Sequence, residues 1–165
     1  MTYFFDASFL IALFNSEDLF HSKAAEIIKN AEPHSPFFIT SNIAVAETVN
    51  ALFRANGVIV TKKFISSFKK SNIEEFFVTK EIFSLSYKLL FQQKSKNKLN
   101  LFDCLHLETM KHLKVDTIFT FDSDFKNFVK INEIDTWSAD KKIKKKTRFN
   151  NTRNSKNPYH QKSRL

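Results

Sequence analysis

Five acidic residues stand either at the ends of expected strands or within apolar stretches expected to be helical. They are Asp6, Glu47, Asp103, Asp122 and Asp124. Asp6 follows the apolar residues 3–5, and the pair at 122 and 124 follows residues 117–120, a β-branched and aromatic run typical of a buried strand. In α/β sheets, ligands bind at the carboxyl ends of the strands. Carboxylates that meet there would repel one another unless a cation lay between them, and oxygen ligands favour Mg²⁺ or Mn²⁺.

Two of these carboxylates, Glu47 and Asp103, lie within apolar stretches of helical spacing. Glu47 belongs to residues 43–53, which are apolar nearly all round and predict a buried helix. A buried carboxylate needs a cation or strong donors. The alternative is that Glu47 shares a narrow solvent-facing strip with Asn50 and Arg54.

Each of the other carboxylates also has a purely structural explanation. With Asn100 as N-cap, Asp103 occupies the third helical position, where it can close a capping box. Asp6 can cap the short helix that it precedes, and Asp122 and Asp124 can be turn residues. The four acidic stretches together are more informative than each alone, because each falls at a strand end or a helix start, the edge where parallel α/β folds place their sites.

Strands that alternate with helices must position these side chains. We expect strands at residues 2–5, 37–40, 75–78 and 117–120, and an edge strand within 129–134. We expect helices at residues 7–14, 18–30 (capped by Asp18), 42–56 (ended by Gly57), 61–71, 80–93 and 101–113, and a helical turn at 125–128. This alternation predicts a mostly parallel sheet with both faces covered.

Composition supports one folded domain. The chain has 165 residues, 42% hydrophobic, with 20 Phe but one Gly and three Pro, which disfavours a loop-rich or all-β fold. Its single cysteine, Cys104, cannot form an intramolecular disulfide, which fits a reducing compartment. The N-terminus is a poor signal peptide, and no apolar stretch approaches the length of a membrane span. We therefore expect a cytoplasmic protein with no membrane partner.

Positive charge is concentrated at the C-terminus. Ten of the 26 basic residues lie from Lys141 onward, which leaves 16 before it against all 17 acidic residues. The tail has almost no apolar residue and cannot offset its ordering entropy, so we expect disorder there. We divide the chain into a domain at residues 1–138 and a basic tail at residues 139–165.

Other classes of site are disfavoured. The sequence has no His/Cys cluster for zinc and no Gly-rich phosphate loop. A strand followed by Asp-x-Asp also opens haloacid-dehalogenase phosphotransferases, but here that motif comes near the end of the folded chain, and Phe125 replaces the usual glycine. Cys104 and Met110 are expected in the core.

Three polar residues beside the carboxylates have open roles. His106 lies one turn after Asp103 and can face the site or donate to a carboxylate, although a packed or surface histidine is the favoured interpretation. Ser8 and Thr120 can hydrogen-bond metal ligands, or cap a helix and a strand end.

Taken together, the acidic stretches resemble the PIN domain family, and most closely its VapC-type toxins. The resemblance covers residues 2–134. The matching stretches are Asp6-Ala7-Ser8, Ala46-Glu47, Phe102-Asp103-Cys104 and Thr120-Phe121-Asp122-Ser123-Asp124-Phe125. It implies a three-layer α/β/α fold and an Mg²⁺- or Mn²⁺-dependent endoribonuclease. Its metal ligands would be Asp6, Glu47, Asp103 and Asp122, with Asp124 as a secondary ligand. It further implies a homodimer and a small antitoxin protein as partner, and gives the basic tail no role.

Two alternatives to a toxin remain. One is a PIN nuclease that acts in RNA processing. The other is an RNA-binding protein without catalysis, whose tail attracts phosphates and whose Phe149 and Tyr159 stack on bases. A pure binder would not need the full acidic set.

Overall fold

Strand β1 (Thr2–Phe5) lies within a five-stranded sheet in the computed structural model, which describes residues 1–93, 99–127 and 130–131. The strand order is β3-β2-β1-β4-β5, with β2 at Phe37–Ser41, β3 at Ile73–Phe76, β4 at Thr117–Phe119 and β5 at Lys130–Ile131. Every neighbouring pair of strands is parallel. The predicted parallel sheet is confirmed.

The register of the sheet brings the ends of three strands to one edge. Phe5, the last residue of β1, pairs with Thr40 of β2 on one side and with Phe119 of β4 on the other. The chain runs from β1 to β2 to β3 in one direction and then returns to place β4 against the free side of β1. The order therefore reverses between β1 and β4, which is the topological switch point where open α/β sheets bind ligands.

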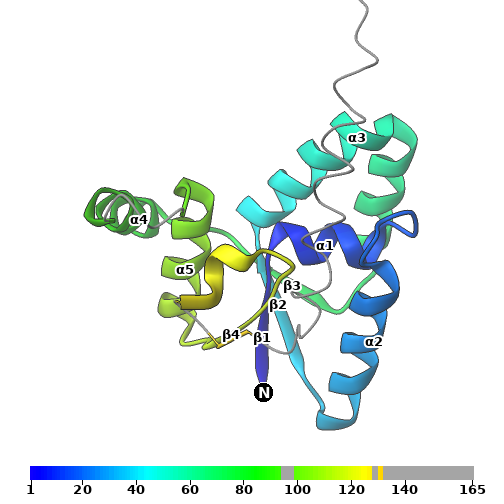
Figure 1. Ribbon diagram of the computed structural model, residues 1–165, viewed down its shortest axis with the longest axis horizontal. Coiled ribbons are helices and arrows are strands. Elements are labelled where there is room, and N and C mark those ends of the chain that lie inside the picture. Colours follow the sequence, from blue (N-terminus) through cyan, green and yellow to red (C-terminus); the bar gives the residue numbers. More distant parts are fainter. Residues whose placement is uncertain (94–98, 128–129, 132–165) are drawn as a thin grey trace, which may run out of the picture. The chain divides into compact units, whose positions relative to one another are not determined.

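Helices cover both faces of this sheet. α1 (Ala7–Phe14), α2 (His21–Ala31) and α3 (Asn42–Phe68) lie on one side, and α4 (Lys80–Gln92) and α5 (Leu101–Leu113) lie on the other (Figure 1). Two short 3₁₀ helices, η1 (Glu32–His34) and η2 (Ser123–Asn127), follow α2 and β4. The predicted three-layer α/β/α fold is thus confirmed.

Phenylalanine fills the two layers of core because alternate strand residues point to opposite faces. Phe4 and Ile118 pack with Leu107 and Met110 on the α5 side. Phe5 points to the α1 side, where its ring lies 4.8 Å from that of Phe9 and 5.4 Å from that of Phe119 (centroid distances). Cys104 and Met110 are buried, as expected.

Several element boundaries differ from those expected. Asp18 does not cap α2, which begins at His21; its carboxylate instead accepts the N–H of Phe20 (2.8 Å) in a preceding turn. The helices expected at residues 42–56 and 61–71 form one helix, α3, with a break at Gly57. Gly57 has φ 78° and ψ −174°, a conformation open to glycine but not to other residues. The predicted third strand lies two residues earlier, at β3, and the predicted helical turn at 125–128 lies earlier, at η2.

The length and apolar composition of α3 are sufficient to cross a membrane. The expectation that no apolar stretch approaches such a length is therefore wrong on this measure. However, α3 carries Glu47 and Arg54, breaks at Gly57, and buries Leu52 and Phe64 within the domain. Only 17% of the apolar window of α3 is buried in the domain, so the prediction of a buried helix at residues 43–53 is met only in part.

Residues Met1–Glu133 form one compact unit. The predicted boundary at residues 138–139 and the predicted disorder of the basic tail lie outside the residues that the structure describes.

Candidate active site

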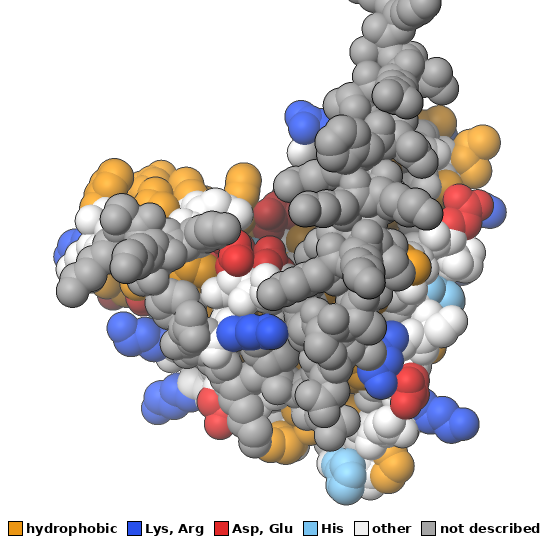
Figure 2. Space-filling model, in the orientation of Figure 1, with side chains coloured by type: hydrophobic (Ala, Val, Ile, Leu, Met, Phe, Trp, Pro, Cys, Tyr) orange, Lys and Arg blue, Asp and Glu red, His pale blue; other side chains and the backbone are white. Residues whose placement is uncertain are grey.

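A cavity of about 620 Å³ opens at the switch point of the sheet. Its walls come from the start of α1, from α3, from the first turns of α5 and from the segment after β4. The acidic residues that line it are Asp6, Glu47, Asp103 and Asp122. On the visible face, acidic side chains gather between the α4–α5 layer and the helices of the other layer (Figure 2). The structure thus brings together the four predicted primary ligands.

Asp6 is the most deeply held of these carboxylates. It is the N-cap of α1, and its Oδ1 accepts the N–H of Phe9 (2.8 Å). The Ser8 hydroxyl lies 2.9 Å from both of its oxygens, and the Thr120 hydroxyl donates to Oδ2 (2.7 Å). Burial to 4% exposure raises the pKa of Asp6 to about 6, although the Thr120, Phe9 and Ser8 donors and the nearby His106 act to lower it. Asp6 therefore both caps α1 and lines the cavity.

The same hydroxyls tie the end of β1 to the segment after β4. Ser8 Oγ accepts the N–H of Phe121 (2.8 Å), and Thr120 Oγ1 accepts the N–H of Asp122 (2.8 Å). Each hydroxyl therefore accepts from the later segment while it donates to Asp6. Of the alternatives left open for Ser8 and Thr120, the structure shows hydrogen bonds from both hydroxyls to an acidic residue of the site.

Asp103 combines a helix cap with a place in the cavity. Asn100 and Asp103 form the predicted capping box at the start of α5, in which Asp103 Oδ2 accepts the Asn100 N–H (2.7 Å). Burial to 6% exposure raises the pKa of Asp103 to about 6. The Asn100 N–H and His106 act to lower it, and the carboxylates of Asp122 and Glu47 act to raise it. Like charges therefore meet at this point.

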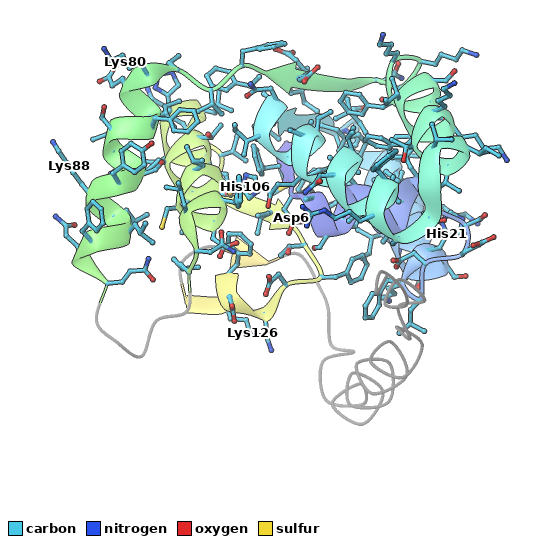
Figure 3. The ribbon with its side chains drawn as sticks, turned by 90° about the horizontal axis from the view of Figure 1, so that it is seen from above. Asp6, His21, Lys80, Lys88, His106 and Lys126 are labelled. Carbon is cyan, nitrogen blue, oxygen red and sulfur yellow. The ribbon has the colours of Figure 1, made fainter. Side chains whose placement is uncertain are left out.

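Glu47 is paired with a histidine. Nε2 of His106 lies 2.8 Å from Oε2 of Glu47, and the carboxylate can only accept, so Nε2–H donates. His106 is 3% exposed, near the rings of Phe4 and Phe125, whereas Glu47 is 26% exposed. His106 points from α5 toward Asp6, into the space beside α3 (Figure 3). The favoured interpretation of a merely packed histidine was incomplete, because this packed side chain also faces the site.

Asp122 and Asp124 have different positions. Asp122 lines the cavity, and its Oδ1 accepts the N–H of Asp124 (2.9 Å), which closes the turn at the start of η2. Asp124 is half-buried and is not among the residues that line the cavity. The structure therefore gives no support to Asp124 as a ligand.

A family model for the PIN domain matches residues 3–131 of this chain. The chain belongs to the PIN domain family. A search among curated proteins by sequence finds no match.

Solved structures with the same fold include toxins and toxin–antitoxin complexes. VapC20 from Mycobacterium tuberculosis, a toxin that cleaves the sarcin–ricin loop, has a TM-score of 0.67 at 22% identity, over 79% of this chain and 99% of that one. VapBC2 from Rickettsia felis, bound to a promoter DNA fragment, has a TM-score of 0.63 at 13% identity, over 80% and 98%. VapBC-1 from nontypeable Haemophilus influenzae has a TM-score of 0.58 at 16% identity, over 81% and 98%. At these identities the likeness shows the fold alone.

The acidic residues of this PIN domain fit a divalent cation by their chemistry. They offer oxygen ligands, and burial raises the pKa of both Asp6 and Asp103, to which the like charges of Asp122 and Glu47 add at Asp103 only. A cation between them would offset that penalty. In the conformation described for residues 1–93, 99–127 and 130–131, no three Asp, Glu, His or Cys side chains lie close enough to hold one ion. The carboxylates line the cavity without closing on a single point.

The remaining wall of the PIN-domain cavity was only partly expected. Asn50 and Arg54 follow Glu47 on one face of α3 and line the cavity with it, so the expected solvent-facing strip is the cavity wall. Phe102 also lines the cavity and is 46% exposed. Phe102 had no predicted role, although its place beside Asp103 in the first turn of α5 was the available signal.

Proposed function

We propose that this PIN domain is a metal-dependent endoribonuclease and the toxin of a toxin–antitoxin pair. The observation that supports the activity is that Asp6, Glu47, Asp103 and Asp122 all line one cavity at the switch point of a parallel sheet. These side chains would hold one or two Mg²⁺ or Mn²⁺ ions. When bound, such an ion lowers the pKa of a water molecule and neutralises charge on the phosphate and on the leaving oxygen.

The chain's own residues hold the acidic groups in place for this chemistry. Ser8 and Thr120 orient Asp6, and the backbone of Asn100 orients Asp103. His106 orients Glu47 from the opposite wall. The proposed hydrolysis requires no nucleophile from the protein, because water attacks the phosphorus.

The toxin assignment rests on the family and on the fold of its neighbours. Two of these neighbours are VapBC complexes, and we propose a small antitoxin protein as partner of this chain and a homodimer as its own assembly. Exposed apolar side chains on α3 and α4 provide surfaces for such contacts; they include Phe53, Val58, Ile59, Leu85, Tyr87 and Phe91. Hydrophobic side chains gather along the upper edge of the α4 layer on the visible face (Figure 2).

The direct test is cleavage of single-stranded RNA by the purified full chain. We expect cleavage in Mg²⁺ or Mn²⁺, none in EDTA, and none from Glu47→Gln. Mn²⁺ should raise the melting temperature of the parent by binding the folded state, and Glu47→Gln should lose most of that increase. The matched control is Glu81→Gln on the exposed first turn of α4, which should behave as the parent does. Cleavage that continues in EDTA would refute the proposal.

The alternatives give different results in the same assays. A non-catalytic RNA-binding protein would bind RNA through its tail with no metal-dependent cleavage. A PIN nuclease of RNA processing would cleave but would not arrest growth when expressed without the product of a neighbouring reading frame.

A further inference from the structure

Two residues on the cavity wall take no part in the acidic site. Phe102 is the second residue of α5, and its N–H donates to the side chain of Asn100 (2.7 Å), which holds the first turn of this helix. Its side chain is 46% exposed at the cavity and makes no ring contact with any other described aromatic residue. Since Phe102 precedes Asp103, this exposed ring is held one residue from a proposed metal ligand.

Arg54 stands on the opposite wall. It lies two helical turns after Glu47 on α3, and it is exposed at the cavity. Within the described part of the chain it has neither an ion-pair nor a hydrogen-bond partner, although the same cavity holds acidic residues. A guanidinium group matches the oxygens of a phosphate with two parallel hydrogen bonds.

A nucleotide offers a base that can stack on an exposed ring and a phosphate that can bind an unpaired guanidinium group. We propose that Phe102 and Arg54 form a nucleotide subsite at this cavity, in which Phe102 stacks on an unpaired base next to the scissile phosphate and Arg54 binds a backbone phosphate. The inference rests on the proposed nuclease function and assigns two residues that would position its single-stranded substrate. The cavity volume of about 620 Å³ is within the range of roughly 300–1,000 Å³ usual for small-ligand sites.

This subsite would select single-stranded over double-stranded RNA and would accept any of the four bases. A base inside a duplex has both faces covered by its neighbours, so it cannot stack on Phe102 without leaving the helix. Stacking tolerates every base because each has a π face. A protein partner is the less suitable occupant, because the largest exposed apolar side chains, such as Phe91 on α4, lie outside the cavity lining.

The experiment uses the full chain and an RNA oligonucleotide that carries 2-aminopurine beside the cleaved bond. Stopped-flow fluorescence in Mn²⁺ under single-turnover conditions should show quenching before cleavage for the parent and for Phe102→Trp. Phe102→Leu should lose the quenching and reduce kcat/KM by about 5- to 150-fold, since stacking contributes about 1–3 kcal/mol per base. The same oligonucleotide annealed to its complement should be neither quenched nor cut.

The arginine variants test the phosphate contact. Arg54→Ala should raise KM and flatten the slope of log affinity against log salt by about 0.7. Arg54→Lys should keep the slope and recover only part of the KM, because lysine retains the charge but not the paired hydrogen bonds. Matched controls are Phe77→Leu, directly after β3, and Lys63→Ala on α3, both exposed and neither lining the cavity. The rise in melting temperature with Mn²⁺ should be the same for all these variants, which shows an intact acidic site.

The outcomes separate this inference from the nuclease proposal. If the parent cleaves RNA but Phe102→Leu cleaves and quenches as well as the parent, the subsite is refuted and the nuclease stands. Equal cleavage of duplex and single strand would also refute it, as would a Phe102→Leu defect confined to antitoxin binding. If Phe102-dependent quenching occurs without any cleavage, the subsite stands and the nuclease proposal fails.

Discussion

Replacing Asp103 by Asn separates the two interactions in which this residue takes part. In the metal-free protein, the buried carboxylate lies near Asp122 and Glu47, and its pKa is raised from 3.8 to about 6. The folded protein therefore holds this proton more tightly than the unfolded chain does. Stability falls as the pH rises from about 4 to 6 and stays low above pH 6. Asp103→Asn removes the charge, and with it this contribution to the pH dependence.

The magnitude follows from the shift of about 2 pH units. At about 1.4 kcal/mol per unit, the penalty above pH 6 is at most about 3 kcal/mol, and solvent screening of this carboxylate reduces it to about 2 kcal/mol. The asparagine still costs some burial energy and weakens the capping box, whose loss costs about 1 kcal/mol. We expect a net gain of about 1–2 kcal/mol at pH 7.5 in EDTA, or roughly 3–8 °C in melting temperature for a domain of this size. At pH 4 only the weaker cap remains, so the variant should be equal to or less stable than the parent.

Thermal unfolding in EDTA from pH 4 to pH 8 measures this crossover. Asn100→Ala is the matched control, because it removes the cap without removing the charge and should destabilise the domain by about 1 kcal/mol at every pH. A lower melting temperature for Asp103→Asn at pH 7.5, with no dependence on pH, would show that capping dominates and would refute the charge-repulsion reasoning.

Three further predictions concern other parts of the chain. Thr120→Val removes a donor to the Asp6 carboxylate and should cost about 2 kcal/mol by urea unfolding at pH 7.5 but less at pH 5, where Asp6 is protonated; an equal loss at both pH values would contradict this. Gly57→Ala should cost about 1–3 kcal/mol through backbone strain alone, because its Cβ would meet no atom within 4 Å, while RNA cleavage per folded molecule stays unchanged. Truncation after Asp140 removes ten basic residues and, if half of them contact phosphates, should flatten the salt dependence of RNA binding by about three units; an unchanged slope would leave the tail a role in solubility or protein contact.

Local patterns were sufficient to predict most of the fold. The strand before Asp6 and the capping box at Asn100 each depend on a few consecutive residues, and both are found where expected. The break at Gly57 was also predictable from the single glycine, but the immediate continuation of the helix to Phe68 was not. Whether a helix resumes at once or after a linker depends on what the second half packs against, here through Phe64 and Phe68.

The side-chain partners in the site were harder to predict because they join distant segments. The contact of Asp6 with Thr120 exists only because β1 and β4 are neighbours in the sheet. The contact of Glu47 with His106 exists only because α3 and α5 pack together. Helical spacing placed Arg54 on the same face as Glu47, yet it could not show whether that face meets water or a cavity. Phe102 was missed because an exposed aromatic residue is unusual only once its surroundings are known.

The order of the strands also determines when, during translation, the acidic cavity can exist. Asp6 emerges first, but its partner Thr120 and the neighbouring Asp122 are contributed by the segment between β4 and η2, more than a hundred residues later. At about 5–20 residues per second, the ribosome needs on the order of ten seconds to synthesise the chain between them. A nascent PIN domain has its first carboxylate but no complete cavity during that time. Under the proposed activity, the ribosome that makes this protein is exposed to its nuclease only when nearly the whole domain has been synthesised.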